Sequence, residues 1–193
     1  MDLNSICVYC GSSPGLLPEY TKAAFGFGQL VARRKLTLVY GGGNVGLMGA
    51  LADGAVAENG KVIGVMPRRL IDKEIAHQGI AELHSVQTMH ERKTKMADLS
   101  DAFVALPGGF GTLEEIFEVY TWTQLNLQAK PCAFLNVAGF YTPLIKFLDH
   151  VVVQQFVKPE HYQALIVEDD AEEILERIKS YQHKIIDKLT DRV

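Results

Sequence analysis

The fold is decided by the stretch Ala102-Phe103-Val104-Ala105-Leu106-Pro107-Gly108-Gly109-Phe110-Gly111-Thr112-Leu113-Glu114-Glu115. Its first five residues are apolar, as expected of a strand that is covered on both faces of a sheet. Glycines follow at once, and a helical pattern comes after them. A strand, a glycine turn and a helix N-terminus together make a place where a phosphate binds. The acid in the first helical turn is an addition that a bare phosphate site does not need.

Outside this stretch the chain alternates between short apolar runs and longer helical patterns. We predict strands at Ser5–Tyr9, Leu36–Tyr40, Val62–Val65, Glu82–Val86, Ala102–Leu106, Cys132–Asn136 and Ala164–Val167. We predict helices at Glu19–Arg33, Leu47–Asn59, His90–Leu99, Leu113–Leu127, Thr142–Gln154 and Ala171–Gln182. Strands that are apolar on both faces and separated by helices are typical of a parallel sheet covered on two sides. Right-handed crossovers then give an α/β, doubly wound, Rossmann-like sheet.

Length and composition set the outer limits. The 193 residues suffice for one sizeable core, and no linker, repeat or low-complexity tract divides them, so we expect a single domain over residues 1–193. The formal net charge of −4 gives no global reason to expect nucleic acid or an anionic membrane as a partner. No apolar run is long enough to cross a membrane, and the N-terminus lacks the pattern of a signal peptide. We therefore expect a cytoplasmic protein that holds any anionic ligand at a local site.

The cysteines do not have the spacing of a metal site. Cys7 and Cys10 form a C-x-x-C at the end of the first predicted strand, and Cys132 belongs to a later strand. A structural zinc ion needs four ligands, and the chain has no second cysteine or histidine pair at a suitable spacing. We predict reduced thiols and no metal.

A second glycine-rich turn, Gly41–Gly46, also follows a strand and opens a helix. Its first, third and sixth residues fit the G-x-G-x-x-G spacing of dinucleotide sites. An NAD site needs an acid at the end of the next strand, where this chain has Arg68 and Arg69. Two arginines suit a 2′-phosphate, so an NADP-dependent oxidoreductase is one open interpretation. The other is structural, with glycines that serve a tight turn and close backbone packing.

The loop Pro107–Glu115 departs from the dinucleotide pattern. Glu114 stands where the pattern has its last glycine, and a glutamate there puts charge and bulk where a pyrophosphate needs close helix packing. A monophosphate can still bind the amides of Gly109 to Leu113, with the Thr112 hydroxyl as a further donor.

Two interpretations of Glu115 remain open. Thr112-x-x-Glu115 is a capping box, with Thr112 as the N-cap, and such a cap stabilises a helix by ~1 kcal/mol. Alternatively, Glu115 is an acid placed for chemistry beside a bound phosphate.

A basic partner for this loop comes from the preceding helical pattern. Met89, Arg92, Lys93 and Met96 are spaced i, i+3, i+4 and i+7, so they share one helical face. One interpretation is a surface helix whose cations reach out to solvent. The other directs Arg92 and Lys93 at the anion and the acid of the glycine loop.

At these residues the chain resembles the LONELY GUY (LOG) family of phosphoribohydrolases, whose members have often been labelled lysine decarboxylases. The family pattern P-G-G-x-G-T-x-x-E is met by Pro107–Glu115, G-G-G-x-x-G-L-M-G by Gly41–Gly49, and M-x-x-R-K by Met89–Lys93. The likeness extends over essentially the whole chain. The three motifs in this order are far more specific than either glycine loop alone.

The resemblance implies hydrolysis of the N-glycosidic bond of a nucleoside 5′-monophosphate, with an N6-prenylated adenine, as in cytokinin activation, or adenine itself as the base. It implies Arg92 and Glu115 as the catalytic pair. It implies substrate binding by Glu74, Met89, Lys93, Gly108, Gly109, Phe110, Gly111, Thr112, Leu113, Glu114 and Thr121. We expect secondary nucleotide contacts at Ser12, Gly42, Gly43 and Asn44. The family is typically dimeric and needs neither a metal nor a nicotinamide cofactor, so we expect a homodimer without cofactors.

Two functions of other classes compete with this one. An NADP-dependent oxidoreductase would bind its cofactor at Gly41–Gly46. A non-catalytic nucleotide-binding module would bind AMP without releasing the base, and the same fold occurs in molybdenum-cofactor carriers.

Overall fold

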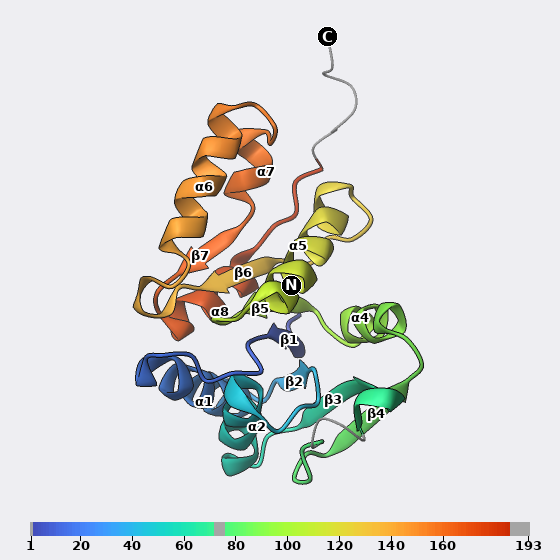
Figure 1. Ribbon diagram of the computed structural model, residues 1–193. Coiled ribbons are helices and arrows are strands. Elements are labelled where there is room, and N and C mark those ends of the chain that lie inside the picture. The colour runs from blue at the N-terminus through green and yellow to red at the C-terminus, as the bar shows by residue number, and fades with distance from the viewer. Residues whose placement is uncertain (1, 72–75, 186–193) are drawn as a thin grey trace.

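The computed structural model describes residues 2–71 and 76–185, and its centre is a seven-stranded sheet of parallel strands (Figure 1). The strands are β1 (Ser5–Tyr9), β2 (Thr37–Tyr40), β3 (Val62–Pro67), β4 (Glu82–Val86), β5 (Ala102–Ala105), β6 (Cys132–Leu135) and β7 (Ile166–Glu168). Their order across the sheet is β4-β3-β2-β1-β5-β6-β7. The chain starts in the middle, winds to one edge, and returns to wind to the other. This confirms the predicted doubly wound, Rossmann-like fold.

The direction of winding reverses at β1. This strand pairs with β2 on one side and with β5 on the other, so Val8 lies opposite both Tyr40 and Val104. In open parallel sheets, ligands bind at the carboxyl ends of the strands beside such a reversal. The loops after β1, β2 and β5 are therefore the place to look for a site.

Helices cover both faces of the sheet. They are α1 (Pro18–Arg33), α2 (Gly46–Ala57), α3 (Arg68–Ile71), α4 (Met89–Asp98), α5 (Phe110–Gln124), α6 (Thr142–Val153), α7 (Pro159–Gln163) and α8 (Ala171–Ser180), with a 3-10 turn at Val137–Gly139. Helices α1, α2 and α8 pack on one face, in a core that includes Val8 and Leu51. Helices α4, α5 and α6 pack on the other, in a core that includes Tyr9 and Phe103.

The predicted elements are confirmed, with some shifted ends. All seven strands lie within two residues of their predicted bounds. Two short helices were not predicted, the four-residue helix α3 after β3 and the five-residue helix α7. The largest shift at the start of a helix is in α5, which begins at Phe110 and not at Leu113. That shift matters for the site.

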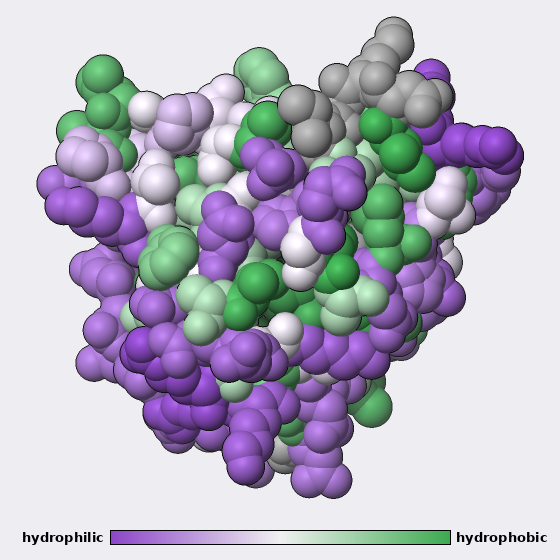
Figure 2. All heavy atoms as spheres, turned by 90° about the horizontal axis from the view of Figure 1, so that it is seen from below, coloured by the Kyte–Doolittle hydropathy of each residue, from purple (hydrophilic) through white to green (hydrophobic). Residues whose placement is uncertain are grey.

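No helix within residues 2–71 or 76–185 is both long enough and apolar enough to span a bilayer. Figure 2 shows the molecule from below, where hydrophilic residues cover most of the face and apolar residues gather near its middle.

Helices α1 and α2 pack side by side below the sheet (Figure 1), and glycines let their backbones touch. A Cβ added to Gly28 of α1 would lie 2.0 Å from the Leu51 carbonyl oxygen, and one added to Gly54 of α2 would lie 2.0 Å from the Phe25 carbonyl oxygen. Neither backbone can move without separating the helices, so these positions accept no side chain.

We predict that Gly28→Ala lowers the free energy of unfolding by about 1–3 kcal/mol, because the new methyl overpacks the contact between α1 and α2. Gly26→Ala is the matched control in the same helix, since a Cβ there meets nothing within 4 Å. It should stabilise by roughly 0.5–1 kcal/mol through helix propensity. Urea unfolding measures both, and equal effects of the two substitutions would contradict the packing argument.

Candidate active site

A cavity of about 360 Å³ opens at the carboxyl ends of β1, β2 and β5, beside the reversal of winding. It is lined by Val8, Tyr9, Cys10, Gly11, Ser12, Gly41, Met48, Met66, Leu70, Met89, Arg92, Met96, Gly109, Phe110, Gly111, Thr112, Glu114 and Glu115. Residues from both glycine-rich turns and from α4 therefore meet in one place, as the fold predicts.

The glycine loop after β5 leads directly into the N-terminus of α5. The N-cap is Gly109, in an extended conformation (φ −94°, ψ −155°) and without a side-chain cap, and its carbonyl accepts from the Leu113 amide at 3.1 Å. By helix geometry the amides of Phe110, Gly111 and Thr112 then lack a carbonyl partner within the helix. This helix N-terminus carries a partial positive charge and suits an anion.

Of the two interpretations of Glu115, the capping box with Thr112 as the N-cap does not form. Thr112 lies inside the helix and is buried, with its side chain against Gly108. A Cβ on Gly108 would lie 2.1 Å from the Thr112 hydroxyl oxygen and 2.9 Å from the Gly11 amide. The Gly11 amide also donates to the Pro107 carbonyl at 3.0 Å. The loop is thus packed tightly against the end of β1, and the helix starts early.

The two glycines that follow are different, because packing does not require them. A Cβ on Gly109 or Gly111 would meet nothing within 4 Å, and both residues are exposed at the cavity. Neither has a positive φ. Glycine at such positions leaves the backbone open to close approach by a ligand.

A buried ion pair forms one wall of the cavity. Arg92 Nη1 donates to Glu115 Oε1 at 2.7 Å, and the two side chains are only 12% and 10% exposed. Arg92 Nε donates to the Val65 carbonyl of β3 at 3.0 Å. A Cβ on Gly41 would lie 2.1 Å from Arg92 Nη2, so the first glycine of the earlier turn makes room for the guanidinium.

Burial sets the ionisation of Glu115. Removal from water raises the pKa of this carboxyl, and the Arg92 guanidinium opposes the shift without cancelling it. The pKa of Glu115 therefore stays above the ordinary value of 4.5. A carboxylate in this setting is poorly solvated and depends on its cation.

Helix α4 directs Arg92 at Glu115 and is fixed at its start. The Thr88 hydroxyl caps the helix by accepting from the Glu91 amide at 3.1 Å, and the Glu91 carboxylate accepts from the Gln87 amide at 2.9 Å. A capping motif thus forms here and not at Thr112. The Thr88-x-x-Glu91 signal was present in the sequence and was missed.

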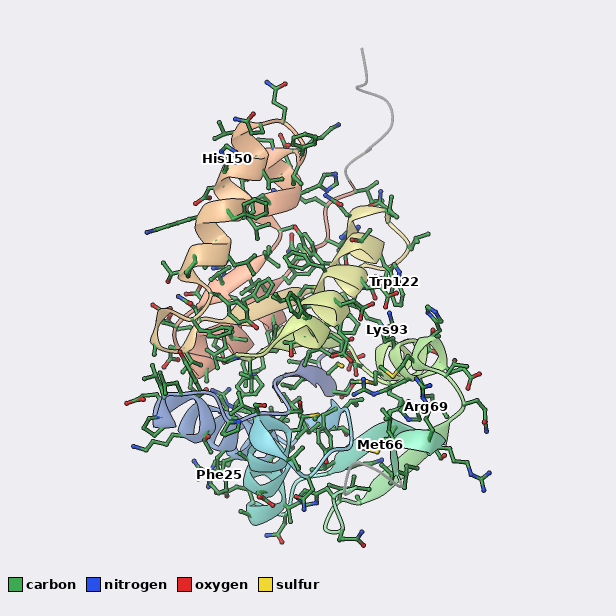
Figure 3. All side chains as sticks on the ribbon, in the orientation of Figure 1. Phe25, Met66, Arg69, Lys93, Trp122 and His150 are labelled. Carbon is green, nitrogen blue, oxygen red and sulfur yellow. The ribbon has the colours of Figure 1, made fainter. Side chains whose placement is uncertain are left out.

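Lys93 does not point into the cavity. Its ammonium is buried between α4 and α5, where it pairs with Glu114 at 2.5 Å and with Glu118 at 2.9 Å (Figure 3). Met89 and Met96, on the same helix, do line the cavity.

The other predicted contacts divide into those at the cavity and those away from it. Phe110, Gly109, Gly111, Thr112, Glu114 and Ser12 line it. Within the described part of the chain, Gly108, Leu113, Thr121, Gly42, Gly43 and Asn44 are not among its lining residues. The Thr121 hydroxyl donates to the Phe117 carbonyl of its own helix. Glu74 lies outside the described residues.

Backbone conformation and close packing explain why glycine is needed in the earlier turn, Gly41–Gly46. Gly46 has a φ of +58°, and a Cβ there would lie 2.3 Å from the Ser12 carbonyl carbon. The Leu47 amide, at the start of α2, donates to the Gly11 carbonyl at 3.0 Å. An amide occupied in this way is not available to a pyrophosphate, which supports the structural interpretation of this turn.

Sequence reasoning missed the apolar wall of the cavity. The chain has five methionines, and four of them line this cavity: Met48, Met66, Met89 and Met96. Methionine is flexible and polarisable, so it fits irregular or aromatic surfaces. The gathering of one residue type from three elements, α2, β3 and α4, was the signal, but only the fold brings those elements together.

Burial disfavours the thiolate form of three cysteines, of which Cys10 lines the cavity. Cys7, Cys10 and Cys132 are free and buried, and burial raises the pKa of each thiol. In residues 2–71 and 76–185, no group of three or more histidine, cysteine or acidic side chains is placed to hold a metal ion.

The fold and the site define an α/β protein with an uncapped helix N-terminus that suits an anion and a buried carboxylate beside it. Residues 48–178 match a family model described as "Possible lysine decarboxylase". The chain is 48% identical over 177 residues to the cytokinin riboside 5′-monophosphate phosphoribohydrolase of Rhodococcoides fascians, covering 91% of this chain and 89% of that protein. It is 43% identical over 189 residues to the cytokinin riboside 5′-monophosphate phosphoribohydrolase LOG7 of Arabidopsis thaliana, covering 97% and 86%.

These relatives show that the chain belongs to the LONELY GUY (LOG) family of phosphoribohydrolases. Solved structures agree on the fold. The molybdenum cofactor binding protein of Rippkaea orientalis aligns at 25% identity with a TM-score of 0.67, over 93% of this chain and 98% of that one. A Moco carrier protein of Chlamydomonas reinhardtii aligns at 20% identity with a TM-score of 0.71, over 93% and 97%. The latter likeness shows the fold alone.

We predict that Arg92→Met destabilises the protein by roughly 3–5 kcal/mol at pH 8, because it leaves a buried carboxylate unpaired. Without the guanidinium the pKa of Glu115 rises further, so the folded chain binds a proton more readily than the unfolded chain does. The loss should therefore shrink as the pH falls through that raised pKa. Urea unfolding at pH 8 and pH 5 measures this.

The control is Arg33→Met, which breaks the Arg33–Glu58 pair on the surface. It should change stability little at either pH. A loss for Arg92→Met that does not depend on pH would contradict the account of Glu115.

Proposed function

We propose that this protein hydrolyses the N-glycosidic bond of a nucleoside 5′-monophosphate and releases the free base and ribose 5-phosphate. The observation that carries the proposal is the buried Glu115 carboxylate, paired with Arg92 and placed one helical turn from the open amides of α5. The relatives named as cytokinin riboside 5′-monophosphate phosphoribohydrolases support it. The base is an N6-prenylated adenine or adenine itself.

Glu115 is the group that acts on the sugar. Breaking a ribosyl C–N bond builds positive charge on the ring, as in an oxocarbenium ion. A carboxylate beside C1′ stabilises that charge and orients or activates the attacking water. Because Glu115 is buried, its charge acts through a low dielectric and is effective at short range.

Arg92 keeps Glu115 ionised and fixed in direction. Its guanidinium is itself held by the Val65 carbonyl, so the pair has little freedom to reorient. A preorganised charge of this kind costs no rearrangement when the transition state forms.

The 5′-phosphate is the handle that positions the sugar. Phe110, Gly111 and Thr112 line the cavity at the uncapped start of α5, and their amides receive the phosphate in this proposal. Binding energy from the phosphate then orients the reacting carbon near Glu115. The methionine wall gives the base an adaptable apolar surface.

We predict that Glu115→Gln and Arg92→Ala each lower kcat for base release from AMP and from isopentenyladenosine monophosphate by about 10²–10³-fold. Chromatography of the released base measures both substrates and shows which base is preferred. Glu176→Gln, which removes an exposed acid that pairs with Arg34, is the control and should stay near wild type. Near-wild-type release by Glu115→Gln would contradict the proposal.

Three further observations separate the competing functions. A non-catalytic nucleotide-binding module would be stabilised against heat by AMP and would release no base. An NADP-dependent oxidoreductase would bind the dinucleotide in a titration, at the turn where the Leu47 amide is occupied. A lysine decarboxylase that forms a Schiff base needs a neutral amine, whereas carboxylates raise the pKa of Lys93 even against the opposing effect of its burial.

We further propose that the protein works as a homodimer in the cytoplasm, with no nucleic-acid partner. Phe110 lines the cavity and is 94% exposed, and this exposed aromatic side chain supports the proposal that a second chain or a ligand covers it. Static light scattering should give twice the chain mass of 21.4 kDa. A mass of one chain that does not change with concentration would contradict the dimer.

A further inference from the structure

Lys93 is a buried cation that the proposed reaction leaves without a task. Its residue is only 6% exposed, yet it does not line the cavity where the structure describes the walls. A lysine is rarely buried unless it is paired. Its partners are Glu114 and Glu118, which lie one helical turn apart on α5.

Consecutive residues on the two helices form two adjacent ion pairs. Arg92 and Lys93 follow one another on α4, and Glu114 and Glu115 follow one another on α5. Arg92 and Glu115 both line the cavity, whereas in the second pair Glu114 lines it and Lys93 does not. The geometry of one pair therefore constrains the other, because both depend on the same separation and rotation of α4 and α5.

The second pair also sets the charge around Glu115. The titratable groups that act on Glu115 or are acted on by it come from α4, α5 and the end of β1: Arg92, Lys93, Glu114, Cys7, Tyr9 and Cys10. Burial raises the pKa of the thiols and of the Tyr9 phenol, so these groups stay neutral. That leaves Glu114, whose charge opposes ionisation of Glu115, and Lys93, whose charge favours it.

We propose that Lys93 is a positioning residue for the reaction: it neutralises Glu114 and Glu118 and holds α5 against α4, so that Glu115 faces Arg92 in its ionised form. This inference rests on the proposed function. It differs from the expectation that Lys93 binds the substrate, because an ammonium occupied by two carboxylates is not free for a phosphate.

The test compares Lys93→Met with the triple variant Lys93→Met/Glu114→Gln/Glu118→Gln. Lys93→Met removes the cation and leaves two carboxylates near Glu115, whereas the triple variant removes all three charges. The pH dependence of kcat for AMP is measured for each variant and for wild type. Using kcat removes the titration of free substrate from the comparison.

The acid limb is the part of the pH profile in which kcat falls as Glu115 is protonated. For Lys93→Met we expect this acid limb to shift to higher pH by about one unit, with KM changed by less than about 3-fold. The triple variant should return the limb to within about 0.3 unit of wild type, because the like charges have gone with the cation. Lys93→Arg keeps the cation and should keep the wild-type limb, which guards against a Lys93→Met protein that does not fold.

Other outcomes overturn the inference. If Lys93 binds the phosphate, KM for AMP rises at least 10-fold in both Lys93→Met and the triple variant, and the limb stays in place. If Lys93 only holds α4 and α5 together, both variants lose kcat and thermal stability, and the acid limb of the kcat profile does not shift. A wild-type protein that releases no base would instead overturn the proposed function, so the two failures are distinguishable.

Discussion

The ion pair between Arg92 and Glu115 is the constraint on which the rest of the site depends. A carboxylate buried to this degree is costly unless a cation reaches it. The guanidinium reaches it because Gly41 has no side chain and because the Val65 carbonyl holds the Nε group. Strands β2 and β3 and helices α4 and α5 must all be in register for this to happen. The doubly wound topology brings these strands and helices together at the carboxyl ends of the strands.

Helix α5 carries both halves of the proposed chemistry. Its first amides are open to a phosphate, and Glu115 follows about one turn later, roughly 5 Å along the axis. That separation is on the scale of the distance from a 5′-phosphate to the anomeric carbon of a ribose. Gly109 and Gly111, which packing does not require, keep the approach to these amides clear. In the proposed reaction the same short segment binds the substrate and acts on it.

The sequence predicted the strands and most helices because each is a local pattern of apolar residues. Helical spacing offered contact between Arg92 and the acid of the loop as one of two interpretations, and the family resemblance implied Arg92 and Glu115 as a pair. Prediction from the sequence failed where long-range contacts decide. Thr112 had the pattern of a cap but packs against Gly108. Lys93 had the pattern of an anion ligand, but Glu118 and Glu114 occupy it. The methionine wall combines residues of α2, β3 and α4, and no local pattern marks it.

The most direct measurement of the central claim is a crystal structure of the Glu115→Gln protein with AMP bound. The account predicts a phosphate within hydrogen-bond distance of the Phe110, Gly111 and Thr112 amides, and C1′ of the ribose beside the side chain at position 115. A phosphate bound instead at the Gly41–Gly46 turn, or a ribose directed away from position 115, would contradict it.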